Sequence, residues 1–171
     1  MRIKNIFTAT TLLLLFVVLS TFVALAQNDK GKETSQQYKS KVSGVVQELK
    51  DLASKNQNIG EEVRVVAQEQ EELNERAANA MEKVEARGGF KTFLIGTDYK
   101  NIGALRSEVV TTQNHIDRLT KAKERATDDL IKADLDAQIQ ALEEANASAL
   151  NFIQTNESKF SLFGWFVRLF Q

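Results

Sequence analysis

Residues 88–103, GGFKTFLIGTDYKNIG, decide the fold of this 171-residue chain. Half of the eight glycines fall in this stretch, and the chain has no proline, the residue that most reliably interrupts a helix. On either side lie long stretches rich in Ala, Glu, Lys, Gln and Leu, which are strong helix formers. We therefore expect two long helices, over about 35–87 and 101–156, joined by this glycine-bearing segment.

The expected helix over 35–87 carries a seven-residue apolar repeat. Its a positions hold Val42, Leu49, Val63, Ala77 and Val84, and its d positions hold Val45, Leu52, Ile59, Val66, Leu73 and Ala80. A repeat sustained for more than three or four heptads is a specific signal for a coiled coil. Asn56 and Gln70 occupy the remaining a positions, where a polar residue commonly specifies the register. Neither needs a ligand to explain it.

A second row of apolar residues flanks this repeat and consists of Val46, Ala53, Ala67 and Met81. The apolar face is therefore wider than the seam between two helices requires. We expect two copies of the chain to pair through this flank, which predicts a homodimer that forms a four-helix bundle.

The expected helix over 101–156 has an apolar stripe that changes phase. Its first part holds Leu105, Val109, Ile116, Leu119, Ala126 and Leu130, and from Ile131 the stripe continues through Leu135, Ile139, Leu142, Ala149 and Ile153. Such a slip is typical of a stutter, which locally unwinds a coiled coil.

The charges indicate how the two helices pair. If the chain reverses near Gly96, Glu69 lies opposite Lys123, and other opposite charges also meet. Each exposed pair contributes only about 0–1 kcal/mol, but flanking charges do select pairing direction and register. The sequence thus predicts an all-α fold, a long antiparallel helical hairpin (coiled coil) over 35–156, with arms of about 75 Å.

An export signal precedes the helices. Residues 1–26, MRIKNIFTATTLLLLFVVLSTFVALA, begin with Arg2 and Lys4, continue as an uncharged apolar run and end in small residues. We predict a signal peptide that is cleaved after Ala26, a flexible linker over 27–34, and a protein that is secreted or resides in the periplasm or cell envelope. The alternative is an uncleaved anchor, since about 20 apolar residues suffice to cross a bilayer.

Composition excludes several classes of partner and site. Removal of residues 1–26 takes away two of the 22 basic residues and none of the 23 acidic ones, which leaves a net charge of −3 and predicts no nucleic-acid partner. With no cysteine there is no disulfide framework. His115 is the only histidine and no glutamate lies three residues before it, so we expect a surface histidine and no metal, cofactor or catalytic site.

The connecting segment 88–103 is unusually apolar and holds Phe90, Phe93, Leu94, Ile95, Tyr99 and Ile102. It is expected either to form a small local core that caps the hairpin or to be a tip that binds a partner or touches a membrane. Gly88 and Gly89 can supply the positive-φ residues that end the first long helix, and Thr97 or Asp98 can cap the next helix.

The C-terminal segment 157–171 is the most apolar part of the chain after the leader. Its candidate interaction residues are Phe160, Phe163, Trp165, Phe166, Arg168 and Phe170. A helix of this length is too short to span a bilayer, but tryptophan, phenylalanine and a lone arginine suit a membrane interface. The alternative is that the tail packs on protein. In a two-helix hairpin it would emerge at the end opposite residues 90–95.

These features predict an exported, non-enzymatic coiled-coil protein that acts as an interaction or scaffolding element of the cell envelope. Its partner would be another protein or a second copy of the chain, with peripheral membrane contact through the tail. The alternative is a holdase chaperone that shelters unfolded exported proteins between its helical arms. The layout of leader and helical hairpin resembles, in outline, the exported helical chaperones of the bacterial periplasm.

Overall fold

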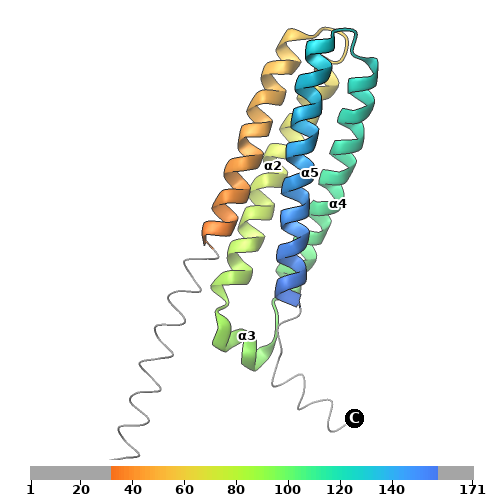
Figure 1. The fold of residues 1–171 in the computed structure, drawn as a ribbon. Coiled ribbons are helices and arrows are strands. Elements are labelled where there is room, and N and C mark those ends of the chain that lie inside the picture. Colours follow the sequence, from red (N-terminus) through yellow and green to blue (C-terminus); the bar gives the residue numbers. More distant parts are fainter. Residues whose placement is uncertain (1–31, 158–171) are drawn as a thin grey trace, which may run out of the picture.

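The computed structural model describes residues 32–157, apart from the side chain of Phe90, as an up-down-up-down bundle of four long helices (Figure 1). A first helix spans residues 32–55, and it is followed by α2 (Gly60–Ala86), the short α3 (Gly89–Ile95), α4 (Tyr99–Arg125) and α5 (Asp129–Glu157). The prediction of an all-α fold is confirmed.

Several predicted segments fall outside the described residues, namely the signal peptide at 1–26 and the tail at 158–171. The first helix already includes residue 32, so the last three residues of the predicted linker are helical. None of the described helices is both long enough and apolar enough to cross a membrane.

The predicted helix over 35–87 is in fact two helices separated by a turn at residues 56–59. The Oδ1 atom of Asn56 accepts hydrogen bonds from the backbone N–H groups of Asn58 (2.9 Å) and Ile59 (3.2 Å). An asparagine side chain that bonds the backbone in this way competes with helical bonding and favours a turn. Asn56 therefore makes a turn, and its predicted role within a continuous coiled coil is wrong.

The phase change in the second half of the chain is also a turn, at residues 126–128, and not a stutter. Asp128 caps α5, because its Oδ1 atom accepts hydrogen bonds from the N–H groups of Leu130 (2.8 Å) and Ile131 (3.4 Å). The side-chain amide of Asn58 donates to the carbonyl oxygen of Arg125 (3.0 Å), which ties the two unpredicted turns together at one end of the bundle.

These two turns change the dimensions and the pairing of the helices. At 27 residues, α2 and α4 are each about 40 Å long, about half the predicted arm length. They are antiparallel as predicted, but Glu69 pairs with Arg118, whereas Lys123 pairs with Asp136 of α5. The register differs because the chain reverses through the whole of α3 and not at Gly96 alone.

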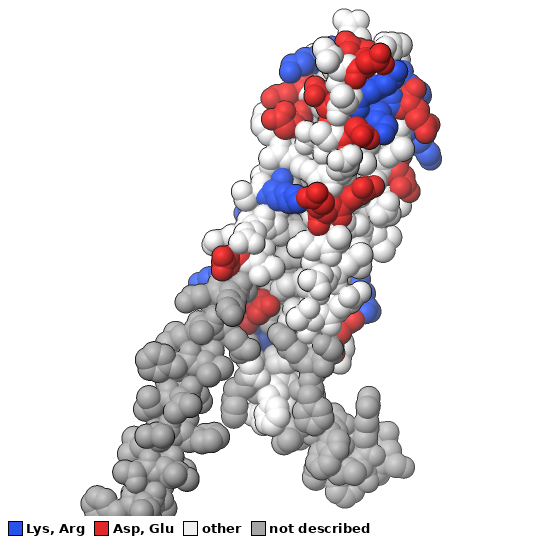
Figure 2. All heavy atoms as spheres, in the orientation of Figure 1, with Lys and Arg blue, Asp and Glu red and all other residues white. Residues whose placement is uncertain are grey.

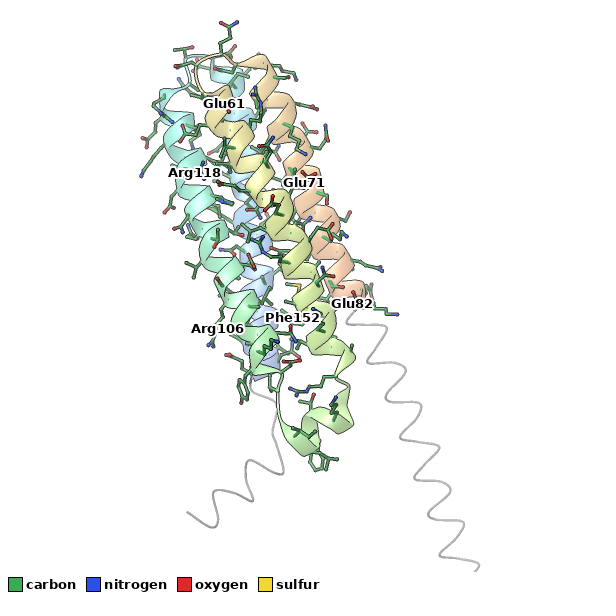
Figure 3. The ribbon with its side chains drawn as sticks, turned by 180° about the vertical axis from the view of Figure 1, so that it is seen from behind. Glu61, Glu71, Glu82, Arg106, Arg118 and Phe152 are labelled. Carbon is green, nitrogen blue, oxygen red and sulfur yellow. The ribbon has the colours of Figure 1, made fainter. Side chains whose placement is uncertain are left out.

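The apolar face of each helix points into one shared core. The flank that predicted a homodimer is buried within a single chain, with exposures of 3% for Val46, 4% for Ala53 and 0% for Ala67 and Met81. Figure 3 shows the glutamates and arginines that it labels directed outward from the helices. The apolar flank thus supplies no surface for a second copy, because helices of the same chain already cover it.

Gly60 allows the first helix and α2 to meet closely, and its replacement tests this contact. A Cβ atom at residue 60 would lie 2.3 Å from the backbone oxygen of Ala53, whereas one at Gly44 would have nothing within 4 Å. We expect Gly60→Ala to lower the free energy of unfolding by about 1–3 kcal/mol through overpacking. Gly44→Ala, inside the first helix, should raise it by up to about 1 kcal/mol.

Urea denaturation of the two variants and the parent chain measures both effects. Equal stability of Gly60→Ala and Gly44→Ala would contradict the close approach of residue 60 to Ala53.

Candidate functional site

α3 closes one end of the bundle, and glycines at both of its ends make this closure possible. Gly88 has φ 71° and Gly96 has φ 96°, both in the left-handed region that glycine adopts readily. The side chain of Asp98 caps α4 by accepting a hydrogen bond from the N–H of Asn101 (3.3 Å). The predicted helix-ending role of Gly88 and the predicted cap at Asp98 are confirmed.

Asp98 also holds neighbouring elements in place. Burial alone would raise the pKa of its carboxyl group, but hydrogen bonds from Asn101 and the positive charges of Arg87 and Lys100 outweigh burial, so the pKa lies below its ordinary value. A carboxylate at this position therefore stays ionised and links the end of α2 to the start of α4.

The C-terminal end of α5 lies beside the connection between α3 and α4. The hydroxyl of Thr97 donates a hydrogen bond to the carbonyl oxygen of Asn156 (2.7 Å), and Arg106 of α4 forms an ion pair with Glu157. The described chain therefore ends at the same end of the bundle as α3 (Figure 1). The prediction that the tail emerges at the opposite end is wrong, because four helical passes return the chain to the α3 end.

The predicted interaction residues divide into buried and exposed groups at this end. Ile102 is buried and Leu94 is half-buried, as a local cap would require, while Phe93, Ile95 and Tyr99 are 44%, 61% and 66% exposed. The buried residues fit the expected local cap, and the role of the exposed residues in binding a partner or a membrane stays a prediction. The side chain of Phe90 and the residues Phe160, Phe163, Trp165, Phe166, Arg168 and Phe170 lie outside what the structure describes.

A buried polar layer at mid-height of the bundle is the feature that sequence reasoning missed. His115 is 3% exposed, so the expectation of a surface histidine is wrong. Its Nδ1 atom lies 2.8 Å from Oε1 of the fully buried Gln70, whose Nε2 atom donates to the hydroxyl oxygen of Thr112 (3.4 Å). On the outer side, Nε2 of His115 lies 3.2 Å from the carboxylate of Glu69, which also pairs with Arg118.

The first helix extends this layer. Tyr38 is buried, and its hydroxyl group is hydrogen-bonded with Thr112; burial and the charge of Glu108 raise its pKa to about 12. Asn74 donates to the carbonyl oxygen of Lys39 and to the hydroxyl of Ser43, both at 3.0 Å.

Two carbonyl oxygens near this layer lack a hydrogen-bond partner among the described residues, Oδ1 of Asn74 and Oδ1 of Asn146. Two ion pairs between α4 and α5 locate the second oxygen: Lys123 pairs with Asp136, and Arg106 pairs with Glu157. In α4, His115 is midway between Arg106 and Lys123, and in α5, Asn146 is midway between Asp136 and Glu157. The buried Asn146 is therefore level with His115.

The surroundings of His115 determine its protonation state. Because Oε1 of Gln70 only accepts hydrogen bonds, Nδ1 of His115 carries the proton. Protonation of Nε2 would add a bond to Glu69 but would place a charge in the core. Burial, assisted by the charge of Arg118, outweighs the attraction of Glu69, so the pKa of His115 lies below its ordinary 6.5.

A groove of about 340 Å³ opens beside His115 on the surface between α2 and α4. Its charges compensate one another, since Arg118 pairs with Glu69, and Arg76 pairs with both Glu72 (3.8 Å) and Glu108 (2.9 Å). Over residues 32–157, no three His, Cys, Asp or Glu side chains gather as metal ligands. The groove and polar layer therefore have the character of a structural network.

The contribution of the polar layer to stability can be tested at Gln70. In Gln70→Leu, Nδ1 of His115 and the hydroxyl of Thr112 each lose a buried partner. We expect the free energy of unfolding to fall by about 1–3 kcal/mol. Adding His115→Leu should cost less than the two single changes combined, because the second change removes the unpaired group. Strict additivity in urea denaturation would contradict the coupling.

The burial of His115 predicts a pH dependence. The pKa of His115 is lower in the folded than in the unfolded chain. At high pH the histidine is neutral in both states, so it does not lower the free energy of unfolding there. As pH falls through 6.5, the unfolded chain takes up the proton more readily and stability declines. The free energy of unfolding should therefore drop further between about pH 7.5 and 5.5 in the parent than in His115→Gln. Equal drops would contradict this assignment.

No protein-family model matches this chain, and neither a curated protein nor a solved structure does.

Proposed function

We propose that this protein is an exported, non-enzymatic interaction and scaffolding element of the cell envelope. The observation that carries the proposal is the closed core of the bundle, which leaves charged sides and one apolar end. The leader-like sequence at residues 1–26 supports export. Over residues 32–157, the one histidine is engaged in core hydrogen bonds and an ion pair with Glu69, which favours a structural role over acid–base catalysis.

The closed core also favours a scaffold over a holdase. A holdase that shelters clients between long arms needs apolar surface along the arms. Here each of the four long helices contributes large apolar side chains that are fully buried in the shared core, among them Leu49, Leu73, Leu105 and Leu142. The exposed apolar residues on the sides of the bundle, such as Val110 and Leu150, are scattered singly, as on ordinary soluble proteins.

The sides of the bundle are suited to a specific protein partner. Ion pairs between neighbouring helices hold the charged groups in place, for example Lys50 of the first helix with Glu71 of α2 (2.8 Å) and Arg76 of α2 with Glu108 of α4 (2.9 Å). A rigid bundle with a definite charge pattern can orient a partner and select against others. We therefore expect one discrete partner, either another protein or a second copy of the chain.

Two measurements separate scaffold from holdase. Purified protein at an equimolar ratio should leave the aggregation of a denatured client protein unchanged, because no apolar cradle is open. A photo-crosslinking side chain at Val110 or Leu150, used in cells, should capture one discrete adduct. Suppressed aggregation together with a heterogeneous set of adducts would favour the holdase, and an enzymatic activity lost on one polar substitution would contradict both.

A further inference from the structure

We propose that the α3 end of the bundle, consisting of Phe93, Leu94, Ile95 and Tyr99 with Lys91 and Lys100, binds the surface of an anionic lipid bilayer. The long axis of the bundle would then point away from the membrane. This inference rests on the proposed function in one respect only, the location of the protein at the cell envelope. Lipid binding itself can be measured on the purified chain.

Three of the six large apolar residues that are exposed within residues 32–157 lie together at the α3 end. Ile95 and Tyr99 expose more than half of their side chains, Phe93 exposes nearly half, and Leu94 is half-buried beside them. Aromatic and aliphatic side chains of this kind enter the boundary between headgroups and acyl chains, where tyrosine can keep its hydroxyl in water. The end therefore has the chemistry of an interfacial contact.

The charges around this surface favour an anionic lipid. From Arg87 to Lys100 there are three basic residues and one acidic residue, Asp98, which gives a net charge of +2; Arg106 is neutralised by its ion pair with Glu157. Asp98 lies 4.0 Å from Arg87, whereas the exposed Lys91 and Lys100 have no carboxylate within 4.0 Å among the described residues. Two exposed lysines without a close carboxylate, next to exposed aromatic side chains, complement an anionic headgroup layer.

The opposite end of the bundle has a different character. There the charges of both signs meet in pairs, for example Arg125 with Glu62. Figure 2 shows acidic and basic side chains crowded around that end and few charged residues on the visible part of the α3 end. The difference between the two ends gives the bundle a preferred orientation at a lipid surface.

The positions where the chain leaves the described region agree with this orientation. The first helix starts, and α5 finishes, at the α3 end (Figure 1). Residues 158–171, which directly follow α5, are rich in apolar residues and carry Lys159 and Arg168 but no acidic residue. The sequence that follows α5 thus has the same apolar and basic composition as the segment at the α3 end.

The orientation can be measured with one probe at each end, since the chain contains no cysteine. Ile95→Cys places an environment-sensitive fluorophore at the α3 end, and Leu130→Cys, at a residue 76% exposed near the other end, is the control. Vesicles of phosphatidylcholine with about 30% phosphatidylglycerol contain brominated lipids as contact quenchers. We expect the probe at residue 95 to be quenched and the probe at residue 130 to be unaffected.

Variants then test which residues provide the binding. Phe93→Glu with Ile95→Glu should weaken partitioning into these vesicles by about tenfold or more. Lys91→Glu and Lys100→Glu should each weaken it by about fivefold at low salt. Lys55→Glu with Lys121→Glu changes exposed lysines near the other end and should have no such effect. All these positions are on the surface, so circular dichroism should show unchanged helices.

Three results would overturn the proposal. One is a lack of quenching at residue 95 in vesicle-bound protein, including the case in which only Trp165 of the tail is quenched. Another is equal quenching at residues 95 and 130. The third concerns the emission maximum of Trp165: a maximum that is already at short wavelength in buffer, does not change with lipid and shifts to longer wavelength in the Phe93→Glu, Ile95→Glu variant. This result would mean that the tail covers the α3 end.

Failure of these measurements is distinguishable from failure of the proposed function. Vesicle binding uses purified protein and lipid alone, whereas the scaffold is tested by crosslinking through Val110 and Leu150 on the sides of the bundle. A protein that binds one partner but no lipid refutes only the membrane contact.

Discussion

The width of the apolar face on each long helix is the constraint on which this structure depends. A two-helix coiled coil covers a narrow seam, but the first helix and α2 also carry Val46, Ala53, Ala67 and Met81 beside that seam. Burying a large apolar side chain contributes about 1.5–3 kcal/mol, so each helix needs two neighbours. The turns at 56–59 and 126–128 supply those neighbours from the same chain, and no disulfide or proline is needed to direct the arrangement.

The polar layer gives this apolar core a defined register. Apolar contacts are non-directional, so two helices with similar stripes can slide by a turn at little cost. Gln70 and His115 oppose such a slip, because each would lose its hydrogen-bond partner inside the core. Buried polar groups of this kind are best known for specifying register. Gln70 was expected to have that role from its place in the heptad, although its partner was not foreseen.

Much of the local structure follows from the sequence, and the failures have definite physical causes. The heptads over residues 42–84 correctly identify the inward-facing apolar residues, yet they run through the first turn without a break, because Ile59 is buried in the turn just as it would be in a helix. In the second half, Leu130 was wrongly assigned to the apolar stripe: it follows the turn at 126–128 and is 76% exposed. The residues that indicate the two turns are local: Asn56 and Asn58 precede a glycine at the first turn, and Asp128 lies at the phase change of the second. The polar residues next to His115 in the sequence suggest a surface position. The helical spacing indicates the opposite, because His115 lies three residues after Thr112 and four before Leu119 on one buried face.

The number of helical passes determines where the apolar segments meet. In a two-helix hairpin, the segment at 88–103 would lie at the opposite end from both chain termini. In an up-down-up-down bundle, the second connection lies at the same end as the start of the first helix and the finish of the last, as Figure 1 shows. Two turns made by a few asparagine and aspartate side chains thus bring residues 88–103 to the end from which the N-terminal and C-terminal segments depart.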